Sequence, residues 1–267
     1  MTVEQPDKSQ HDGHQPNGYL ARCVEISKAF GHVQALRSVT FDIERSEVLA
    51  LLGDNGAGKS TLVKILSGVY HPDSGQFLKD GEPVDLNDPT AALNAGIATV
   101  YQDLAVVDSM DVARNVYLGR VPRRFGFLVD FPRMYRDARQ VLKTLRIDLP
   151  SIQTRVGELS GGQRQAVAIA RALAVDASLF LMDEPTAALG VAQTEKVNEV
   201  VADLKSAGKT VVIITHNLDH VFQIADRIVV LRRGLRVGVR RTNETTREEI
   251  VGLITGAIVG DAPAVQA

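Results

Sequence analysis

The stretch GDNGAGKST, residues 53–61, constrains this chain more than any other part of its sequence. It fits the pattern G-x-x-x-x-G-K-[ST] in full, with Gly53, Gly58, Lys59 and Ser60 at the fixed positions. An apolar run precedes it, and apolar residues at helical spacing follow it. Glycines let a backbone wrap closely around phosphate, and a helix N-terminus favours anions. The pattern and its context therefore predict a phosphate-binding loop between a buried strand and a helix.

Single positions of this loop have distinct expected roles. We expect Lys59 to reach the β- and γ-phosphates, Ser60 to offer its hydroxyl to Mg²⁺, and Thr61 to support the α- and β-phosphates. The backbone of the preceding positions would surround the phosphates: Gly53, Asp54, Asn55, Gly56, Ala57 and Gly58. Such a loop alone does not distinguish a kinase from a GTPase or an ATPase.

A pair of carboxylates narrows the choice. Asp183 and Glu184 end the apolar run SLFLMDE. A carboxylate at the carboxyl end of a strand suits a Mg²⁺ held through water, and the next carboxylate can act as general base on the attacking water. Without the upstream loop, the pair would be equally consistent with a solvated acidic turn before Pro185. Together, the two motifs predict hydrolysis of a triphosphate.

The stretch ELSGGQRQAVAIARAL contains a second anion-binding signal. Ser160, Gly161 and Gly162 open a strongly periodic predicted helix, whose first N–H groups would be free to bind an anion. One chain does not need two such sites for one triphosphate. We therefore expect this helix to complete a phosphate site on another copy.

The alternation of strand-like and helical segments predicts an α/β fold with a largely parallel sheet. Two early runs that alternate apolar and polar residues are expected as half-buried strands, RCVEISKAF and SVTFDIE. A central buried strand is expected at SEVLALLG, a short strand at AGIATVYQD, and apolar strands at SLFLMDE and KTVVIITH. A hairpin should turn at Gly234, and TREEIVGLITG should form a terminal helix with a Thr-x-x-Glu start. Residues 107–158 read as an inserted helical subdomain, with helices expected at DVARNVYLGR and MYRDARQVLKTLRI.

Composition excludes several classes of protein. The net charge of −2 gives no general attraction to nucleic acid or anionic lipid. The lone cysteine, Cys23, excludes an intramolecular disulfide framework and is expected to be buried. No apolar run approaches the ~20 residues of a membrane helix. The polar residues 1–18 are expected to be a disordered tail. The insert carries a local excess of arginine, which predicts either a solvated helical face or a docking surface near a membrane.

The chain resembles the nucleotide-binding subunit of an ATP-binding cassette (ABC) transporter over residues 22 to about 240. GDNGAGKST resembles the Walker A motif, LSGGQ (159–163) the signature motif, and LFLMDEP the Walker B motif with its catalytic glutamate. Gln102 in VYQD occupies the position of the Q-loop, and His216 in IITH that of the switch histidine. Phe30 in SKAFG lies where the family places an adenine-stacking aromatic residue, although a plain core role remains an alternative.

This resemblance implies a P-loop NTPase cassette with a mostly parallel core sheet, an antiparallel β subdomain and the inserted helical subdomain. The cassette would span residues 19–256, and residues 257–267 would form a flexible tail. Two copies would dimerise head to tail around two ATP molecules. The triphosphate held by the loop of one copy would be capped by the other copy through Ser160, Gly161, Gly162 and Gln163.

The resemblance also assigns the metal and the chemistry. Mg²⁺ would be placed by Ser60, Gln102 and Asp183, directly or through water. Glu184 would activate the water, and His216 would contact the γ-phosphate. One departure is visible: the family usually has Ser-Ala-Leu-Asp after Walker B, whereas residues 187–190 read AALG. This departure puts the coupling between the two sites in question. It does not put hydrolysis in question, because Glu184 and His216 remain.

Three segments resemble the ATPases of bacterial monosaccharide importers of the ribose, xylose and fructose type: SMDVARNVYLGR, EPTAALGVAQT and TNETTREEIVGLITG. The expected protein is a peripheral ATPase subunit at the cytoplasmic face of the inner membrane, without nucleic acid as a partner. It would work with a second copy, separate permease subunits and, indirectly, a periplasmic sugar-binding protein. The alternatives are a cassette for an amino acid, lipid or drug, a soluble ABC ATPase of DNA repair or translation, and a non-hydrolysing regulatory cassette.

Overall fold

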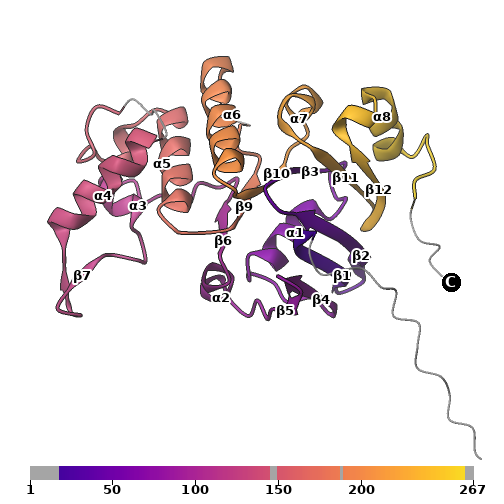
Figure 1. Ribbon diagram of the computed structural model, residues 1–267, viewed down its shortest axis with the longest axis horizontal. Helices are drawn as coiled ribbons and strands as arrows, with labels where there is room; N and C mark the ends of the chain where they lie inside the picture. Colours follow the sequence, from indigo (N-terminus) through magenta and orange to yellow (C-terminus); the bar gives the residue numbers. More distant parts are fainter. Residues whose placement is uncertain (1–17, 145–148, 187–188, 262–267) are drawn as a thin grey trace, which may run out of the picture.

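The structure, a computed structural model, describes residues 18–144, 149–186 and 189–261. Nearly all of the predicted polar tail therefore lies outside the described residues, as do Ala187, Ala188 and the end of the predicted C-terminal tail. The described residues form a six-stranded sheet, a four-stranded sheet, a two-stranded hairpin and the helices around them (Figure 1). Within the described ranges, no helix combines the length and the apolar character that crossing a bilayer would require.

The larger sheet is parallel apart from one edge strand, which confirms the predicted mostly parallel core sheet. In spatial order it contains β12 (Leu235–Arg241), β11 (Arg227–Arg232), β3 (Val48–Leu52), β10 (Thr210–Ile214), β9 (Leu179–Asp183) and β6 (Ile97–Val100). Only β12 is antiparallel to its neighbour. Every residue of β3, β9 and β10 is buried, because both faces of the sheet are covered.

The smaller sheet is antiparallel, as the resemblance implied. It contains β2 (Val33–Glu44), β1 (Tyr19–Phe30), β4 (Ser74–Lys79) and β5 (Glu82–Pro83), in that spatial order. Alternating side chains of β1 and β2 enter the core, and Cys23 is buried there as expected. The α-helices of the described residues are α1 (Lys59–Leu66), α2 (Pro89–Asn94), α3 (Val112–Val116), α4 (Phe131–Thr144), α5 (Gly161–Leu173), α6 (Val191–Ser206), α7 (Leu218–Ile224) and α8 (Arg247–Thr255).

Helix α1 lies between the two sheets and fixes their relative position. Its buried residues are Leu62, Val63, Ile65 and Leu66, and they share one core with both sheets. The opposite face of the larger sheet is covered by α6, α7 and α8 (Figure 1). Helices α3 and α4 pack on α5 in the core that β9 and α6 also share. The boundaries of a helical subdomain at 107–158 stay a prediction.

Two local predictions are confirmed by backbone geometry. The hairpin of β11 and β12 turns at Arg233 and Gly234, with φ of +49° and +79°. Such positive angles suit the tight turns of hairpins. At the start of α8, the Thr246 side chain accepts a hydrogen bond from the backbone N–H of Glu249 at 3.2 Å. This contact is the N-cap expected from the Thr-x-x-Glu pattern.

The structure also differs from the sequence analysis. The helix expected over DVARNVYLGR ends at Val116, and Gly119 then adopts a φ of +79°. A short hairpin that we did not predict follows, formed by β7 (Arg123–Arg124) and β8 (Leu128–Val129). Helices α2, α6 and α7 were also not predicted. At the other end of the chain, the carboxylate of Asp261 pairs with Arg240 of β12.

Gly68 gives a test of how tightly the end of α1 is packed. Its φ is +74°, and an added Cβ would lie 2.2 Å from the carbonyl oxygen of Asp88. Gly81 is a matched control, because its φ is +87° and an added Cβ would meet nothing within 4 Å. We expect Gly81→Ala to lower the free energy of unfolding by about 1 kcal/mol and Gly68→Ala by about 3 kcal/mol. Urea denaturation measures both, and equal losses would contradict the packing argument.

Candidate functional site

Parallel strand pairing brings the predicted site residues to one edge of the larger sheet. Ile214 of β10 lies opposite Leu51 of β3 on one side and opposite Asp183 of β9 on the other. The segments that follow these strands are therefore neighbours: the glycine-rich loop, the acidic pair and His216. This edge is the carboxyl end of the strands, where α/β proteins bind their ligands.

The loop between β3 and α1 requires glycine at two positions. Gly53 and Gly58 have φ of +153° and +103°. An added Cβ at Gly53 would lie 2.3 Å from the backbone oxygen of Leu231, and one at Gly58 would lie 2.5 Å from that of Ala35. The backbone is thus held between β11 and β2 while its other side stays open, with residues 54–56 exposed. Exposed backbone before a helix start suits an anionic ligand.

Lys59 lies over the loop that it follows. Its Nζ donates to the carbonyl oxygens of Gly53 and Asp54, at 2.7 and 3.0 Å. Burial lowers the pKa of Lys59, and the nearby Glu184, Asp183 and Asp54 oppose that shift. The ammonium group therefore stands between the loop and the acidic pair, in a position that can serve both phosphate and carboxylate.

Asp183 is a buried carboxylate at the end of β9. Burial raises its pKa, Glu184 raises it further, and Lys59 and Lys64 lower it. A buried carboxylate is stabilised by a cation, and oxygen ligands are those that Mg²⁺ prefers. Ser60 is exposed on the first turn of α1 and Gln102 is exposed after β6, so the predicted metal set offers hydroxyl, amide and carboxylate oxygens. The residues present fit a magnesium ion.

Glu184 and His216 are in direct contact. Nδ1 of His216 lies 2.8 Å from Oε1 of Glu184. The Glu184 side chain is 14% exposed and that of His216 is 76% exposed, so the pair joins a sheltered carboxylate to an accessible ring. Glu184 has a φ of +48°, which is uncommon for a residue with a side chain, and its backbone N–H donates to Ile214 O at 2.8 Å. The sheet thus holds Glu184 in a strained conformation of the kind found at functional sites.

A second histidine, which the sequence analysis did not single out, stands behind this pair. His220 of α7 is buried, and its Nε2 contacts Oδ1 of Asn198 on α6. Among the residues that the structure describes, its Nδ1 has no hydrogen-bond partner. Both residues line a cavity of about 460 Å³ that also reaches Glu184 and His216. The one-turn spacing of the histidines in HNLDH was a signal that could have found it.

Phe30 ends β1 and is 43% exposed. Its ring meets that of Tyr70 edge-on, with centroids 5.2 Å apart. Tyr70 follows α1, so the two rings join the smaller sheet to the helix that begins at the loop. The exposed part of Phe30 can stack on a planar group, and its role toward adenine stays a prediction.

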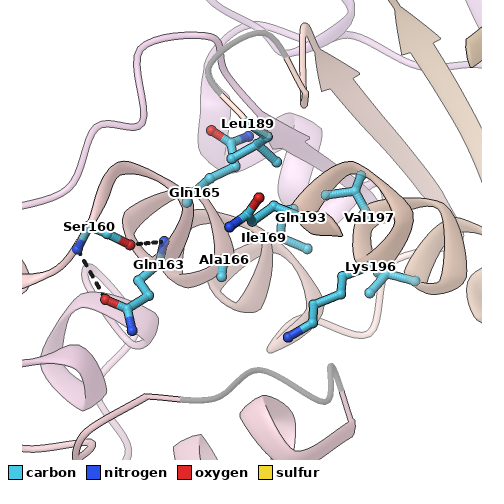
Figure 2. A pocket seen from close by; sticks show the side chains of 11 residues that line it. Ser160, Gln163, Gln165, Ala166, Ile169, Leu189, Gln193, Lys196 and Val197 are labelled. Atoms are coloured by element: carbon cyan, nitrogen blue, oxygen red, sulfur yellow. Dashed lines mark hydrogen bonds between the residues drawn. The ribbon is translucent and has the colours of Figure 1, made fainter. Parts of the chain in front are cut away.

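The signature stretch forms a closed helix start. The Ser160 Oγ accepts from the Gln163 N–H at 3.3 Å, and the Gln163 side chain accepts from the Ser160 N–H at 3.0 Å. Figure 2 shows this capping box at the start of α5, with Gln193 of α6 projecting toward α5. The two helices line a cavity of about 210 Å³. Gly161 is exposed at the start of α5. The capping box orients the first N–H groups of the helix and leaves Gly161 accessible.

The signature helix and the phosphate loop lie apart within one chain. In Figure 1, α5 and α1 are on opposite sides of α6 and β9. The structure therefore brings together the loop, Asp183, Glu184 and His216, but not Ser160–Gln163. A site that uses both groups needs two copies of the chain.

Comparison with known proteins places these features in a family. The profile of the ABC transporter family matches residues 36–187. The chain is 45% identical to the xylose/arabinose import ATP-binding protein XylG of Sulfolobus acidocaldarius, over 90% of this chain and 96% of that protein. It is 42% identical to the fructose import ATP-binding protein FrcA of Rhizobium meliloti, over 87% of this chain and 92% of that protein.

A third relative is longer. The ribose import ATP-binding protein RbsA of Chromobacterium violaceum is 43% identical over 88% of this chain, which spans 47% of that protein. Among solved structures, the dimeric ATP-binding cassette MJ0796 bound to ADP and Pi has a TM-score of 0.74 at 27% identity. That comparison covers 83% of this chain and 98% of the cassette.

The buried His220 gives a pH-dependent prediction. Burial lowers its pKa below the ordinary histidine value of about 6.5, while Glu184 acts in the other direction. Well above pH 6.5, from about pH 7.5 upward, neither state binds a proton at this ring. Below that pH the unfolded chain binds more protons than the folded one, so stability is lost as the pH falls.

We expect urea denaturation to show a decline from pH 7.5 toward pH 5.5, of at most about 1.4 kcal/mol per pH unit for one proton. His220→Gln retains an amide for Asn198 but no titrating ring, and should make this decline shallower. An unchanged decline in the variant would assign the pH dependence to other groups.

Proposed function

This chain belongs to the ABC transporter family, and on that premise we propose that it binds and hydrolyses ATP to energise import of a monosaccharide. The observation that carries the proposal is the Glu184–His216 contact of 2.8 Å, at the same sheet edge as the glycine-rich loop and Lys59. This geometry supports the assignment of a base and an orienting partner beside a phosphate cradle. Family membership makes the enzyme an ATPase, and transport would require separate permease subunits.

The proposed reaction is attack of water on the γ-phosphorus of ATP. The oxygen of water forms a bond to phosphorus, the bond to the β-γ bridging oxygen breaks, and ADP leaves. Glu184 would accept the proton of the water, since its carboxylate is sheltered and lies near enough to Lys59 to raise the pKa of that residue. His216 would orient this carboxylate and, from its exposed position, contact the γ-phosphate.

The binding roles follow from position. Lys59 and the N–H groups of the loop would offset the charge of the phosphates. Ser60, Gln102 and Asp183 would hold Mg²⁺, which when bound supplies positive charge to the β- and γ-phosphates. Phe30 would stack on adenine beside Tyr70. Nothing in this scheme requires the signature residues of the same chain.

The second copy would supply those residues. Ser160 and Gln163 order the start of α5, and Gly161 and Gly162 can approach a γ-phosphate closely because they have no side chains. The separation of α5 from α1 within one chain supports a head-to-tail pair that encloses two ATP molecules. In the loop that departs from the family pattern (residues 187–190), Leu189 and Gly190 are described and Ala187 and Ala188 are not. Altered coupling between the two ATP sites therefore stays a prediction.

The cargo is inferred from the relatives. Their names assign them xylose/arabinose, fructose and ribose import, which supports a monosaccharide over an amino acid, lipid or drug. We place the chain at the cytoplasmic face of the inner membrane, as a peripheral subunit bound to permeases that receive sugar from a periplasmic binding protein. The matched region spans 47% of the ribose relative. The cassette of this chain would pair with a second copy.

The Glu184→Gln variant tests the composite site. Loss of the base should reduce hydrolysis by about 10²–10⁴-fold while the binding groups remain, so the variant should accumulate as a dimer with ATP. Light scattering would detect a doubled mass that disappears without nucleotide. Lys59→Ala is the control and should show weaker ATP binding and no dimer. A Glu184→Gln variant that hydrolyses ATP normally and stays monomeric would refute the assignment.

Sugar import is tested separately. The chain should co-purify with its permease subunits, and in reconstituted vesicles a monosaccharide with its binding protein should raise the ATPase rate several-fold. The same preparation should not respond to amino acids. Stimulation by an amino acid and not by any monosaccharide would retain the ATPase assignment and replace the cargo.

A further inference from the structure

Several neighbouring large apolar side chains are exposed together on the β7–β8 hairpin. This hairpin projects from the end of the molecule that carries α3 and α4 (Figure 1, lower left). Residues 123–129, RRFGFLV, are all exposed. Phe125 and Phe127 are each 74% exposed on either side of Gly126, and Leu128 is 53% exposed. A contiguous apolar group of this kind on a surface marks an interaction site.

Aromatic and charged side chains occupy different positions along the hairpin. Arg123 lies opposite Val129 and Arg124 opposite Leu128, while the two phenylalanines stand at the turn. Successive strand residues point to opposite faces, so each face carries one arginine and one aliphatic side chain. The tip is aromatic and the base is cationic on both faces. This order matches a bilayer interface, where aromatic rings lie at the boundary and cations meet phosphate groups.

The same order argues against a protein groove as the occupant. A groove that covers one face of a hairpin leaves the other face in water. Here both faces and the turn are exposed and apolar in part, so a medium that surrounds the tip on all sides buries more of it. A bilayer interface is such a medium.

The charge around the hairpin is complementary to anionic lipid. Residues 123–139 contain five arginines and two aspartates, although the whole chain has a net charge of −2. On α4, Asp137 pairs with Arg133 and Arg136, and Arg139 is also exposed. Arg124 and Arg114 lie over the rings of Phe125 and Phe131, at 5.0 and 5.6 Å. The cationic and aromatic groups thus lie on adjoining segments of the chain, and we call the exposed side chains of residues 123–139 the hairpin surface.

The base of the hairpin is tied to α4. The backbone N–H of Asp130 donates to Pro122 O at 2.8 Å, and the Asp130 carboxylate accepts from the backbone N–H of Arg133 at 3.0 Å. These contacts close the hairpin and cap the following helix. The hairpin is thus linked to α4, which packs on α5.

We propose that the hairpin surface binds an anionic bilayer directly, with the Phe125–Phe127 tip among the headgroups and the arginines at the lipid phosphates. The inference rests on the proposed function in one respect, since it requires the chain to work at a membrane. It gives the cassette a lipid contact of its own, in addition to any contact with permeases.

Vesicle binding by the full chain tests this proposal. Vesicles of phosphatidylcholine alone are compared with vesicles of phosphatidylcholine and phosphatidylglycerol in equal amounts. We expect at least about tenfold stronger partition onto the anionic vesicles, weakened by salt. F125S/F127S should lower this partition by about tenfold or more. R123Q/R124Q should lower it by on the order of 30-fold and remove most of the salt dependence.

Two controls and one reporter accompany these variants. Val259→Ser removes an apolar side chain that is 94% exposed at the other end of the molecule, and Arg37→Gln removes an exposed charge on β2; both should bind vesicles like the unmodified chain. The sequence contains no tryptophan, so Phe127→Trp introduces a single fluorophore at the tip. Its emission should shift to shorter wavelength with anionic vesicles and be quenched by brominated lipid.

The outcomes separate the explanations. Equal partition onto both kinds of vesicle, or an unshifted Phe127→Trp emission, would overturn the proposal. The proposal would also be overturned if F125S/F127S lost permease binding in detergent but still bound vesicles, because the surface would then be a protein contact. ATP hydrolysis is measured on the same samples: intact hydrolysis without lipid binding refutes only this inference, and lipid binding without hydrolysis refutes only the proposed function.

Discussion

The burial of β3 between two covered faces is the constraint on which the rest of the structure depends. Leu49 and Leu51 belong to the core that α1 and the smaller sheet share, while Ala50 and Leu52 face the core of α7 and α8. A strand fixed on both sides gives the following loop a rigid start. Because β9 and β10 run parallel to it in a fixed register, their carboxyl ends reach the same edge. The loop, Asp183 and Glu184 meet there because the core leaves no other register for the strands.

The electrostatics of the site follow from this burial. Asp183 and Lys59 are both partly withdrawn from water, which disfavours the charged form of each, and each is stabilised by the other. Such a pair responds strongly to an added anion or cation. Phosphate and magnesium would therefore enter a site whose charges are already placed, which reduces the reorganisation needed for reaction.

The sequence was most informative where function depends on residues close together in the chain. The loop glycines, the acidic pair and the capping residues Ser160 and Gln163 could be read from residue type and spacing, because each acts through the local backbone. The contacts across the fold could not be read in this way. The pairing of Phe30 with Tyr70 and of His220 with Asn198 depends on how α1, α6 and α7 pack. The exposure of the β7–β8 tip was equally hidden, since RRFGFLV would also suit a half-buried strand.

The turn at Gly234 has a mechanical consequence. Its N–H donates to the carbonyl oxygen of Ala57 in the phosphate loop, and its own carbonyl oxygen accepts from the N–H of Arg37 on β2. One residue thus links the glycine-rich loop to both sheets. The connection from β2 to this loop runs through backbone groups alone. Substitutions on β2, at the outer edge of the smaller sheet, should therefore alter nucleotide binding at the loop from a distance.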